Sequence, residues 1–256
     1  MRCKVCDHAC KYFGKAFLLS KFNVNYFRCN SCGFIQTEKP YWLAEAYSSA
    51  ISNLDVGLFS RNIYLSRVTR AVIGLFFDKK ARFLDYGGGY GIFVRLMRDK
   101  GFDFYRYDKY CENLFARQFD VELDSSIPYE LVTAFEVFEH FENPSDDIEN
   151  ILKFSSNILL STELVPALLS GPDGWRYLGL EHGQHISFYT VKSLQEIAKR
   201  HGLNLITDGR YIHIFTRSQL PGILFRLICH AAIADIFNVF IRSNSLNDQG
   251  IRRTDL

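Results

Sequence analysis

The chain has 256 residues, of which 48% are hydrophobic and 23% are charged, with a formal net charge of +2. This length suits one full α/β domain with appendages, and the composition is ordinary for a soluble globular protein. The near balance of charge excludes a strong overall attraction to nucleic acid or to an anionic membrane. The start, Arg2 to Cys6, is not that of a signal peptide, so we expect a cytoplasmic protein.

Two CxxC pairs stand near the start of the chain. Their four cysteines are Cys3, Cys6, Cys29 and Cys32. Such pairs supply four thiolates to a tetrahedral Zn²⁺ ion, and a hairpin with arms at residues 17–19 and 25–28 is expected to span the 22-residue gap. Disulfides are the competing interpretation, which a cytosolic location disfavours. His8 and Cys10 are alternative ligands with poorer spacing.

The charge of this zinc-binding lobe, residues 1–39, bears on its role. Seven basic and two acidic residues give it +5, and four thiolates with one Zn²⁺ add about −2. The remaining positive excess is modest. We therefore expect a lobe that packs beside the main domain rather than one that reads nucleic acid.

The main domain is predicted to span residues 40–219. It opens on a linker from Pro40 and an amphipathic helix over about 62–77. A short apolar strand, residues 81–84, then leads into four glycines within five residues and a further helix. This arrangement lets a backbone approach a nucleotide-like ligand at a helix N-terminus. A dinucleotide fingerprint would need a third glycine where the chain has Ile92.

The glycine segment carries a family resemblance. Its pattern, in which an acid precedes three alternating glycines, resembles the first motif of class I S-adenosylmethionine-dependent methyltransferases: Asp85, Gly87, Gly89 and Gly91. A strand is predicted over 103–107, and the resemblance implies that Asp108 at its end binds the ribose hydroxyls of the cofactor. Residues 129–144 are similar to the fourth-strand motif of one methyltransferase subgroup, which implies cofactor contacts by Phe135 and Glu136.

The later elements complete the predicted domain. Strands are expected at 131–135 and 157–161, and Pro144 begins a helix between them. Thr190 is expected to N-cap another helix, and a hairpin over about 203–216 closes the sheet. The resemblance implies an α/β, Rossmann-like, seven-stranded methyltransferase sheet with a small N-terminal zinc-binding lobe.

The region 120–150 contains ten acidic residues and no lysine or arginine. Ligands of α/β sheets sit beyond the carboxyl ends of the strands, and part of this region lies there. Acidic residues at that rim would repel a phosphate backbone. The pattern therefore argues against an RNA or DNA substrate.

A histidine-containing loop supplies the candidates for catalysis. Residues 183–190 resemble a His-x-Ser-aromatic segment of zinc-containing sugar methyltransferases from bacterial nucleotide-sugar and surface-polysaccharide gene clusters, and residues 245–248 are similar to an ending seen there. The resemblance implies that His185 is the general base. Glu181 and His182 form a second acid–imidazole pair that could orient or replace it. His140 is expected to pack beneath the cofactor.

Residues 220–256 are predicted to form a C-terminal helical segment and tail. The stretch 222–241 is apolar over the roughly 20 residues of a membrane span, but Arg226 and Asp235 interrupt it, which disfavours insertion. Three uses stay open: a helix over the substrate cleft, a homodimer contact, or an interfacial helix that touches a membrane peripherally.

These features favour an S-adenosylmethionine-dependent methyltransferase with zinc in its lobe. The acceptor is expected to be a sugar, nucleotide sugar or glycan of bacterial surface polysaccharide biosynthesis, methylated on oxygen by in-line transfer with His185 as base. One alternative keeps the fold and methylates RNA, with the zinc lobe as the reader. The other is a cofactor-binding assembly protein without catalysis.

Overall fold

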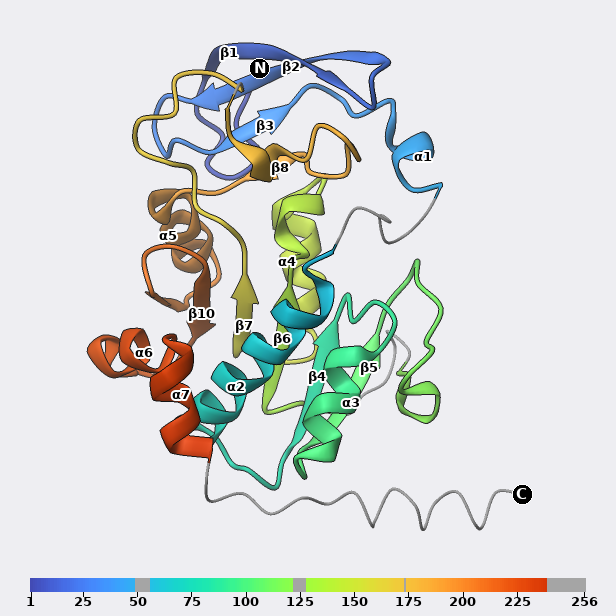
Figure 1. Cartoon of the computed structure of the whole chain (residues 1–256). Coiled ribbons are helices and arrows are strands. Elements are labelled where there is room, and N and C mark those ends of the chain that lie inside the picture. The colour runs from blue at the N-terminus through green and yellow to red at the C-terminus, as the bar shows by residue number, and fades with distance from the viewer. Residues whose placement is uncertain (49–55, 122–127, 173, 239–256) are drawn as a thin grey trace.

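The structure is a computed structural model that describes residues 1–48, 56–121, 128–172 and 174–238 (Figure 1). Its larger sheet has the strand order β5 (Asp103–Tyr107), β4 (Arg82–Tyr86), β6 (Leu131–Phe135), β7 (Ile158–Ser161), β10 (Ile212–Thr216) and β9 (Asn204–Thr207). The first four strands run parallel, and β10 pairs antiparallel with both β7 and β9. The predicted Rossmann-like α/β sheet with its closing hairpin is confirmed.

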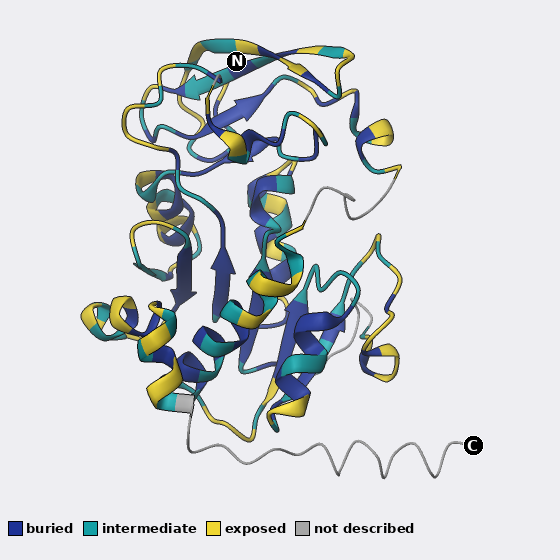
Figure 2. Cartoon of the chain, viewed as in Figure 1, coloured by how far each residue is buried: buried dark blue, intermediate teal, exposed yellow. Residues whose placement is uncertain are grey.

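Helices cover both faces of this sheet. They are α2 (Leu58–Phe76), α3 (Ile92–Asp99), α4 (Pro144–Leu152), α5 (Val191–Arg200), α6 (Gly222–Ile228) and α7 (Ala231–Asn238). Phe83 and Leu131 share one core with α2, α3, α6 and α7, whereas their neighbours Leu84 and Val132 share the other core with α4 and α5. Successive side chains of a strand point to opposite faces, so these two strands carry apolar residues on both faces because both faces are covered. Figure 2 shows them as buried.

The local signals in the sequence place most of these elements. Strands β5 and β6 have the predicted bounds, and Pro144 is the first residue of α4. Thr190 caps α5 as predicted, because its hydroxyl accepts from the Ser193 amide while the Ser193 side chain accepts from the Thr190 amide. Helix α2 starts four residues earlier than predicted, at Leu58.

The smaller sheet forms the N-terminal lobe. It is antiparallel, with the order β1 (Cys10–Leu18), β2 (Phe22–Cys29), β3 (Ile35–Thr37) and β8 (Ser187–Phe188), and the short helix α1 (Leu43–Ala46) follows β3. The predicted hairpin is therefore present, with longer arms. Strand β8 belongs to the segment just before α5, so the chain returns to the lobe after building most of the larger sheet (Figure 1).

The prediction of seven strands in the larger sheet is wrong for the described residues, which supply six. Within the described residues, the free edge of β5 carries only an isolated parallel bridge between Arg106 and Asp120. The Asp120 carboxylate accepts from Arg106 at 2.7 Å and from the Asn113 amide at 3.0 Å, so side chains hold this segment at the edge in place of a ladder. Residues 122–127, which contain two of the predicted rim acids, lie outside the described residues.

The C-terminal segment forms two short helices where one was expected. Helix α6 ends at Ile228 and α7 begins at Ala231. They are fixed to α2, where the Tyr64 hydroxyl donates to the Cys229 carbonyl at 2.7 Å and Arg67 lies 3.5 Å from Asp235. None of the helices in the described part of the chain is long and apolar enough to cross a bilayer. Residues 239–241 and the motif at 245–248 lie outside the described residues.

Candidate active site

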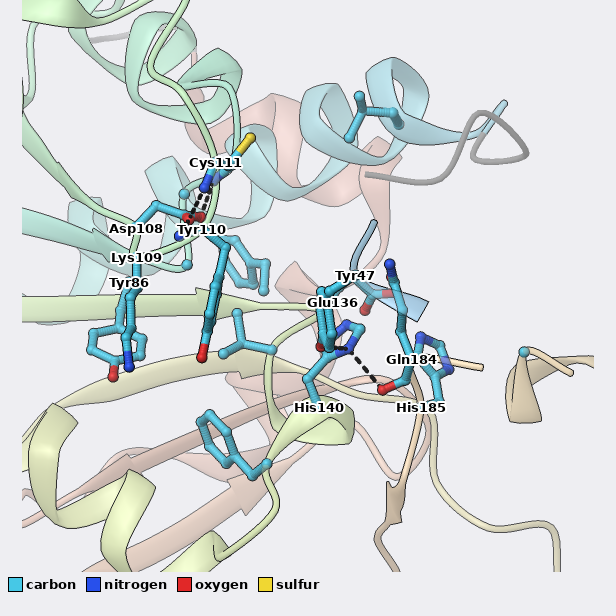
Figure 3. A pocket seen from close by; sticks show the side chains of 18 of the residues that line it. Tyr47, Tyr86, Asp108, Lys109, Tyr110, Cys111, Glu136, His140, Gln184 and His185 are labelled. Atoms are coloured by element: carbon cyan, nitrogen blue, oxygen red, sulfur yellow. Dashed lines mark hydrogen bonds between the residues drawn. The ribbon is translucent and has the colours of Figure 1, made fainter. Parts of the chain in front are cut away.

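A cavity of about 1530 Å³ lies at the carboxyl ends of β4, β5 and β6. It brings together nearly all of the sequence-predicted cofactor and catalytic residues: Asp85, Gly87, Gly89, Asp108, Phe135, Glu136, Glu181, His182 and His185. Figure 3 labels Asp108, Glu136 and His185 among them. Gly91 does not line it and instead precedes the first turn of α3. The described residues of α6 and α7 contribute nothing to the lining, so the expectation of a C-terminal helix over the cleft is wrong for them.

The glycine turn forms the end of the cavity nearest β4. Gly87 and Gly91 have φ angles of +73° and +83°, which disfavour residues with a side chain. A Cβ atom on Gly87 would lie 2.6 Å from the Val137 side chain, and one on Gly91 would lie 2.6 Å from Asn113 Oδ1. The turn therefore needs glycine both for its backbone angles and for its close packing.

Asp108 follows β5 and faces the glycine turn. Its Oδ2 accepts from the Gly89 amide at 2.8 Å, and its Oδ1 accepts from the amides of Tyr110 and Cys111, each at 2.8 Å. An ionised carboxylate has about four acceptor positions, so three amides orient this group and leave room for a further donor. Its ribose-binding role stays a prediction.

Two further acids stand at the strand ends. Asp85 is buried, and burial chiefly raises the pKa of its carboxyl to about 7, although the Thr133 hydroxyl donates to it at 2.6 Å. Glu136 follows β6 with a φ of +54°, a strained conformation for a residue with a side chain. Its Oε1 accepts from the Ser161 hydroxyl at 2.7 Å, and its Oε2 lies 4.0 Å from Arg61.

Three histidine rings meet at the other end of the cavity. His182 and His185 come from the loop before β8, and His140 comes from the 3₁₀ turn Phe138–His140 after β6. The His185 ring centroid lies 5.0 Å from that of His140 and 4.7 Å from that of His182. Sequence reasoning found the loop but assigned His140 to packing, because no local pattern reports that two distant segments converge.

Hydrogen bonds assign the tautomers of these rings in their neutral form. Nδ1–H of His185 donates to the Tyr177 carbonyl at 2.5 Å, so its lone pair lies on Nε2. Nδ1 of His140 lies 3.0 Å from the Tyr47 hydroxyl and 3.1 Å from the Gln184 carbonyl, and because a carbonyl can only accept, we assign the proton to Nδ1 and the lone pair to Nε2. His182 differs, because its Nδ1 accepts from the Gln184 amide at 3.1 Å and its proton is on Nε2. Burial lowers the pKa of His140 to about 4 and that of His185 well below its usual value, so both rings are neutral at pH 7.

Glu139 lies beside the histidines and is fully buried. Its Oε1 accepts from the Tyr177 hydroxyl at 2.6 Å, whereas its Oε2 has no hydrogen-bond partner in the described structure. Burial, and then the charge of Glu136, raise the pKa of the Glu139 carboxyl well above its usual value. A carboxylate oxygen of Glu139 and one ring nitrogen each of His140 and His185 lie within 4.8 Å of one another.

The four predicted cysteines converge in the lobe. Cys3 Sγ lies 3.6 Å from Cys32 Sγ, and Cys6 Sγ lies 3.4 Å from the sulfurs of both Cys29 and Cys32. A tetrahedral ZnS₄ site with bonds near 2.3 Å has sulfurs about 3.8 Å apart, so the cluster is close to the size that zinc needs. Amides of Val5, Ser31 and Cys32 point at the sulfurs from 3.3–3.4 Å. His8 is turned to the Cys6 carbonyl instead.

The lobe holds the histidine loop in place. The Trp42 indole donates to the Gly183 carbonyl at 2.8 Å, and the Gln184 side chain donates to the Ala46 carbonyl at 2.9 Å. The Thr190 hydroxyl donates to the Cys32 carbonyl at 2.6 Å, which ties the start of α5 to the cysteine cluster. The position of His182 and His185 therefore depends on the fold of the lobe.

Residues 60–208 match the profile of a family described as "Methyltransferase domain". No curated protein matches the chain. Among solved structures it is similar to a Burkholderia thailandensis 1,6-didemethyltoxoflavin-N1-methyltransferase with bound S-adenosylhomocysteine, at 11% identity and a TM-score of 0.47, covering 79% of this chain and 97% of that one. It is also similar to an O-methyltransferase family 2 protein from Planctomyces limnophilus, at 15% identity and a TM-score of 0.43, covering 69% of this chain and 65% of that one. The chain thus spans less than two thirds of the latter protein.

Proposed function

The chain belongs to the methyltransferase-domain family, with a domain of the S-adenosylmethionine-dependent class, and we propose that it O-methylates a sugar, nucleotide sugar or glycan such as those of bacterial surface polysaccharides. One observation carries this proposal. The glycine turn and Asp108 lie at one end of a single cavity, and His185, with its lone pair on Nε2, lies at the other.

The cofactor would occupy the end formed by the glycine turn. Asp108 would accept from the ribose hydroxyls, and Gly87 and Gly89 would allow the backbone close to the ligand. Phe135 and Glu136 would contact it from the end of β6. A volume of about 1530 Å³ exceeds the 300–1,000 Å³ typical of small-ligand sites, which leaves space for an acceptor beside the cofactor.

The acceptor end is rich in groups that bind hydroxyls. Tyr47, Glu163, Arg176, Tyr177 and Glu181 line it together with the histidines. Polar side chains that converge in this way suit a polyhydroxylated ligand better than an apolar one.

The reaction itself is an in-line displacement. The acceptor oxygen forms a bond to the methyl carbon while the carbon–sulfur bond breaks and its electron pair returns to sulfur, giving S-adenosylhomocysteine. The hydroxyl proton has to leave, and His185 Nε2 is positioned to take it because Nδ1 is fixed by the Tyr177 carbonyl. His182 is the weaker candidate, since its accepting nitrogen is already used by the Gln184 amide.

Zinc completes the proposal at the four cysteines. The donor set and the sulfur spacing fit Zn²⁺, and a closed Cys₄ site has a structural role. The ion would stabilise the lobe and, through Trp42 and Thr190, the loop that carries His185.

The test measures methyl transfer from isotope-labelled S-adenosylmethionine to a panel of nucleotide sugars, glycans and RNA. We expect a mass gain of one methyl group on a sugar, and at least a 100-fold lower rate for His185→Ala. His230→Ala, an exposed histidine outside the cavity, is the matched control and should retain the wild-type rate. Labelling of RNA alone, or binding of cofactor without transfer to any acceptor, would refute the proposal.

A further inference from the structure

We propose that Glu139, His140 and His185 bind a divalent transition-metal ion at the wall of the cavity, separate from the cysteine cluster. The binding site is inferred from the geometry alone, whereas the role of the ion in methyl transfer rests on the proposed function.

The three donors already lie close together. One possible ligand atom from each residue lies within 4.8 Å of those from the other two. Ligand atoms bound at 2.0–2.2 Å to one ion lie about 3.0–3.5 Å from one another. A movement of about 1 Å by side chains would close the site. His140 and His185 line the cavity, which gives the ion a path of entry.

The atoms that would not bind the ion are fixed by other contacts. Nδ1–H of His185 donates to the Tyr177 carbonyl, and Nδ1–H of His140 donates to the Gln184 carbonyl. The Tyr177 hydroxyl donates to Glu139 Oε1. Histidines that bind metals usually donate their second ring nitrogen to a carbonyl or carboxylate in this way, which sets the tautomer and the ring orientation.

The buried oxygen of Glu139 is the independent sign of a missing cation. Glu139 is fully buried, and its Oε2 has no hydrogen-bond partner in the described residues. A buried polar atom without a partner destabilises a fold, and more so when it is charged. A divalent ion between this oxygen and the two imidazoles would satisfy it.

The donor set indicates the class of ion. Two imidazoles and a carboxylate suit Zn²⁺, Fe²⁺, Mn²⁺ or Co²⁺, whereas Mg²⁺ and Ca²⁺ prefer ligands that are all oxygen. Three protein ligands leave a coordination position open toward the cavity.

An acceptor hydroxyl at that position would lose its proton to water more readily, because the ion stabilises the negative oxygen. The oxygen then attacks the methyl carbon, and the electron pair of the carbon–sulfur bond goes to sulfur. His185 Nε2 would bind the ion with the lone pair that, without the ion, would accept the proton of the acceptor hydroxyl.

Metal content of the full-length protein provides the first test. We expect two equivalents of Zn²⁺ per chain in the wild type, and one in both Glu139→Gln and His185→Ala. The control His230→Ala should keep two, and Cys32→Ser should lose the equivalent held by the cysteines. Circular dichroism and thermal unfolding establish that each variant is folded. A wild type with a single equivalent that only Cys32→Ser removes, or a folded Glu139→Gln that keeps two, would overturn the site.

Activity separates the role of the ion from the proposed function. Wild-type enzyme treated with a chelator until one equivalent remains should methylate its acceptor at least tenfold more slowly, and Zn²⁺ or Mn²⁺ should restore the rate. Transfer that is indifferent to loss of the second equivalent would overturn this role and leave His185 as the direct base. Two equivalents with no transfer to any hydroxyl would support the site and refute the proposed function.

Discussion

The Thr133 hydroxyl on β6 donates to Asp85 Oδ1 on β4 at 2.6 Å, beneath the glycine turn. Asp85 is only 3% exposed, so this bond and the neighbouring charges determine the state of a carboxyl group enclosed by the sheet. Thr133 favours the ionised form by donating to it, but burial outweighs this donation and raises the pKa to about 7. The balance makes Asp85 a source of pH dependence.

We expect Asp85→Asn to remove a pH dependence of stability. The folded pKa of about 7 exceeds the ordinary value of 3.8, so the unfolded state releases this proton first as pH rises. The contribution of Asp85 to stability is therefore greatest below about pH 4, falls up to about pH 7, and is constant above that. Between about pH 4 and pH 7 the contribution of Asp85 to the free energy of unfolding changes by at most about 4 kcal/mol, since one pKa unit corresponds to about 1.4 kcal/mol. Urea unfolding of both proteins from pH 4 to 8 measures it, and parallel profiles would contradict the expectation.

Gly91→Ala should destabilise the protein by about 1–3 kcal/mol and weaken cofactor binding. The new Cβ would meet Asn113 Oδ1 at 2.6 Å, on a backbone with φ of +83°. Gly74→Ala is the control, because it lies within α2 with only the Lys79 side chain near its Cβ, at 3.8 Å. Helix propensity predicts that the control is neutral or stabilising by up to about 1 kcal/mol. Denaturant unfolding and calorimetric titration with S-adenosylhomocysteine give both quantities, and equal effects of the two substitutions would argue against the packing explanation.

If the cysteine cluster binds Zn²⁺ as proposed, removal of the ion should lower the melting temperature by roughly 5–15 °C, since structural zinc contributes directly to folding. Cys32→Ser should have the same effect, because Cys32 lies within 3.6 Å of both Cys3 and Cys6 sulfurs. Cys111→Ser changes a cysteine outside the cluster and should leave the zinc content unchanged. Differential scanning calorimetry with metal analysis is the measurement. An unaltered melting temperature in Cys32→Ser would show that the lobe folds without the ion.

Thr190→Ala should cost about 1–2 kcal/mol, the usual range for loss of an N-cap. The hydroxyl of Thr190 both accepts from the Ser193 amide and donates to the Cys32 carbonyl, so its loss also weakens the contact between the lobe and α5. Thr190→Ser keeps the hydroxyl and should recover most of the stability. Chemical unfolding of the three proteins is sufficient, and a serine variant as unstable as the alanine one would point to the methyl group instead.

The sequence alone determined features that depend on neighbours along the chain. The glycine turn at Gly87, the start of α4 at Pro144 and the cap of α5 at Thr190 follow from backbone preferences and local hydrogen bonds, which act over a few residues. The sequence also predicted the Cys₄ cluster, because two CxxC pairs are the typical spacing of a four-thiolate metal site.

Only the tertiary structure decided which distant residues meet. His140 lies against His185 and Glu139 is buried beside both, because the turn after β6 and the loop before β8 are brought together by the return of the chain to the lobe. The number of strands in the larger sheet and the break between α6 and α7 likewise depend on long-range packing. Examples are the Arg106–Asp120 and Tyr64–Cys229 contacts. No local pattern encodes these contacts, since their partners are chosen by burial across the whole fold.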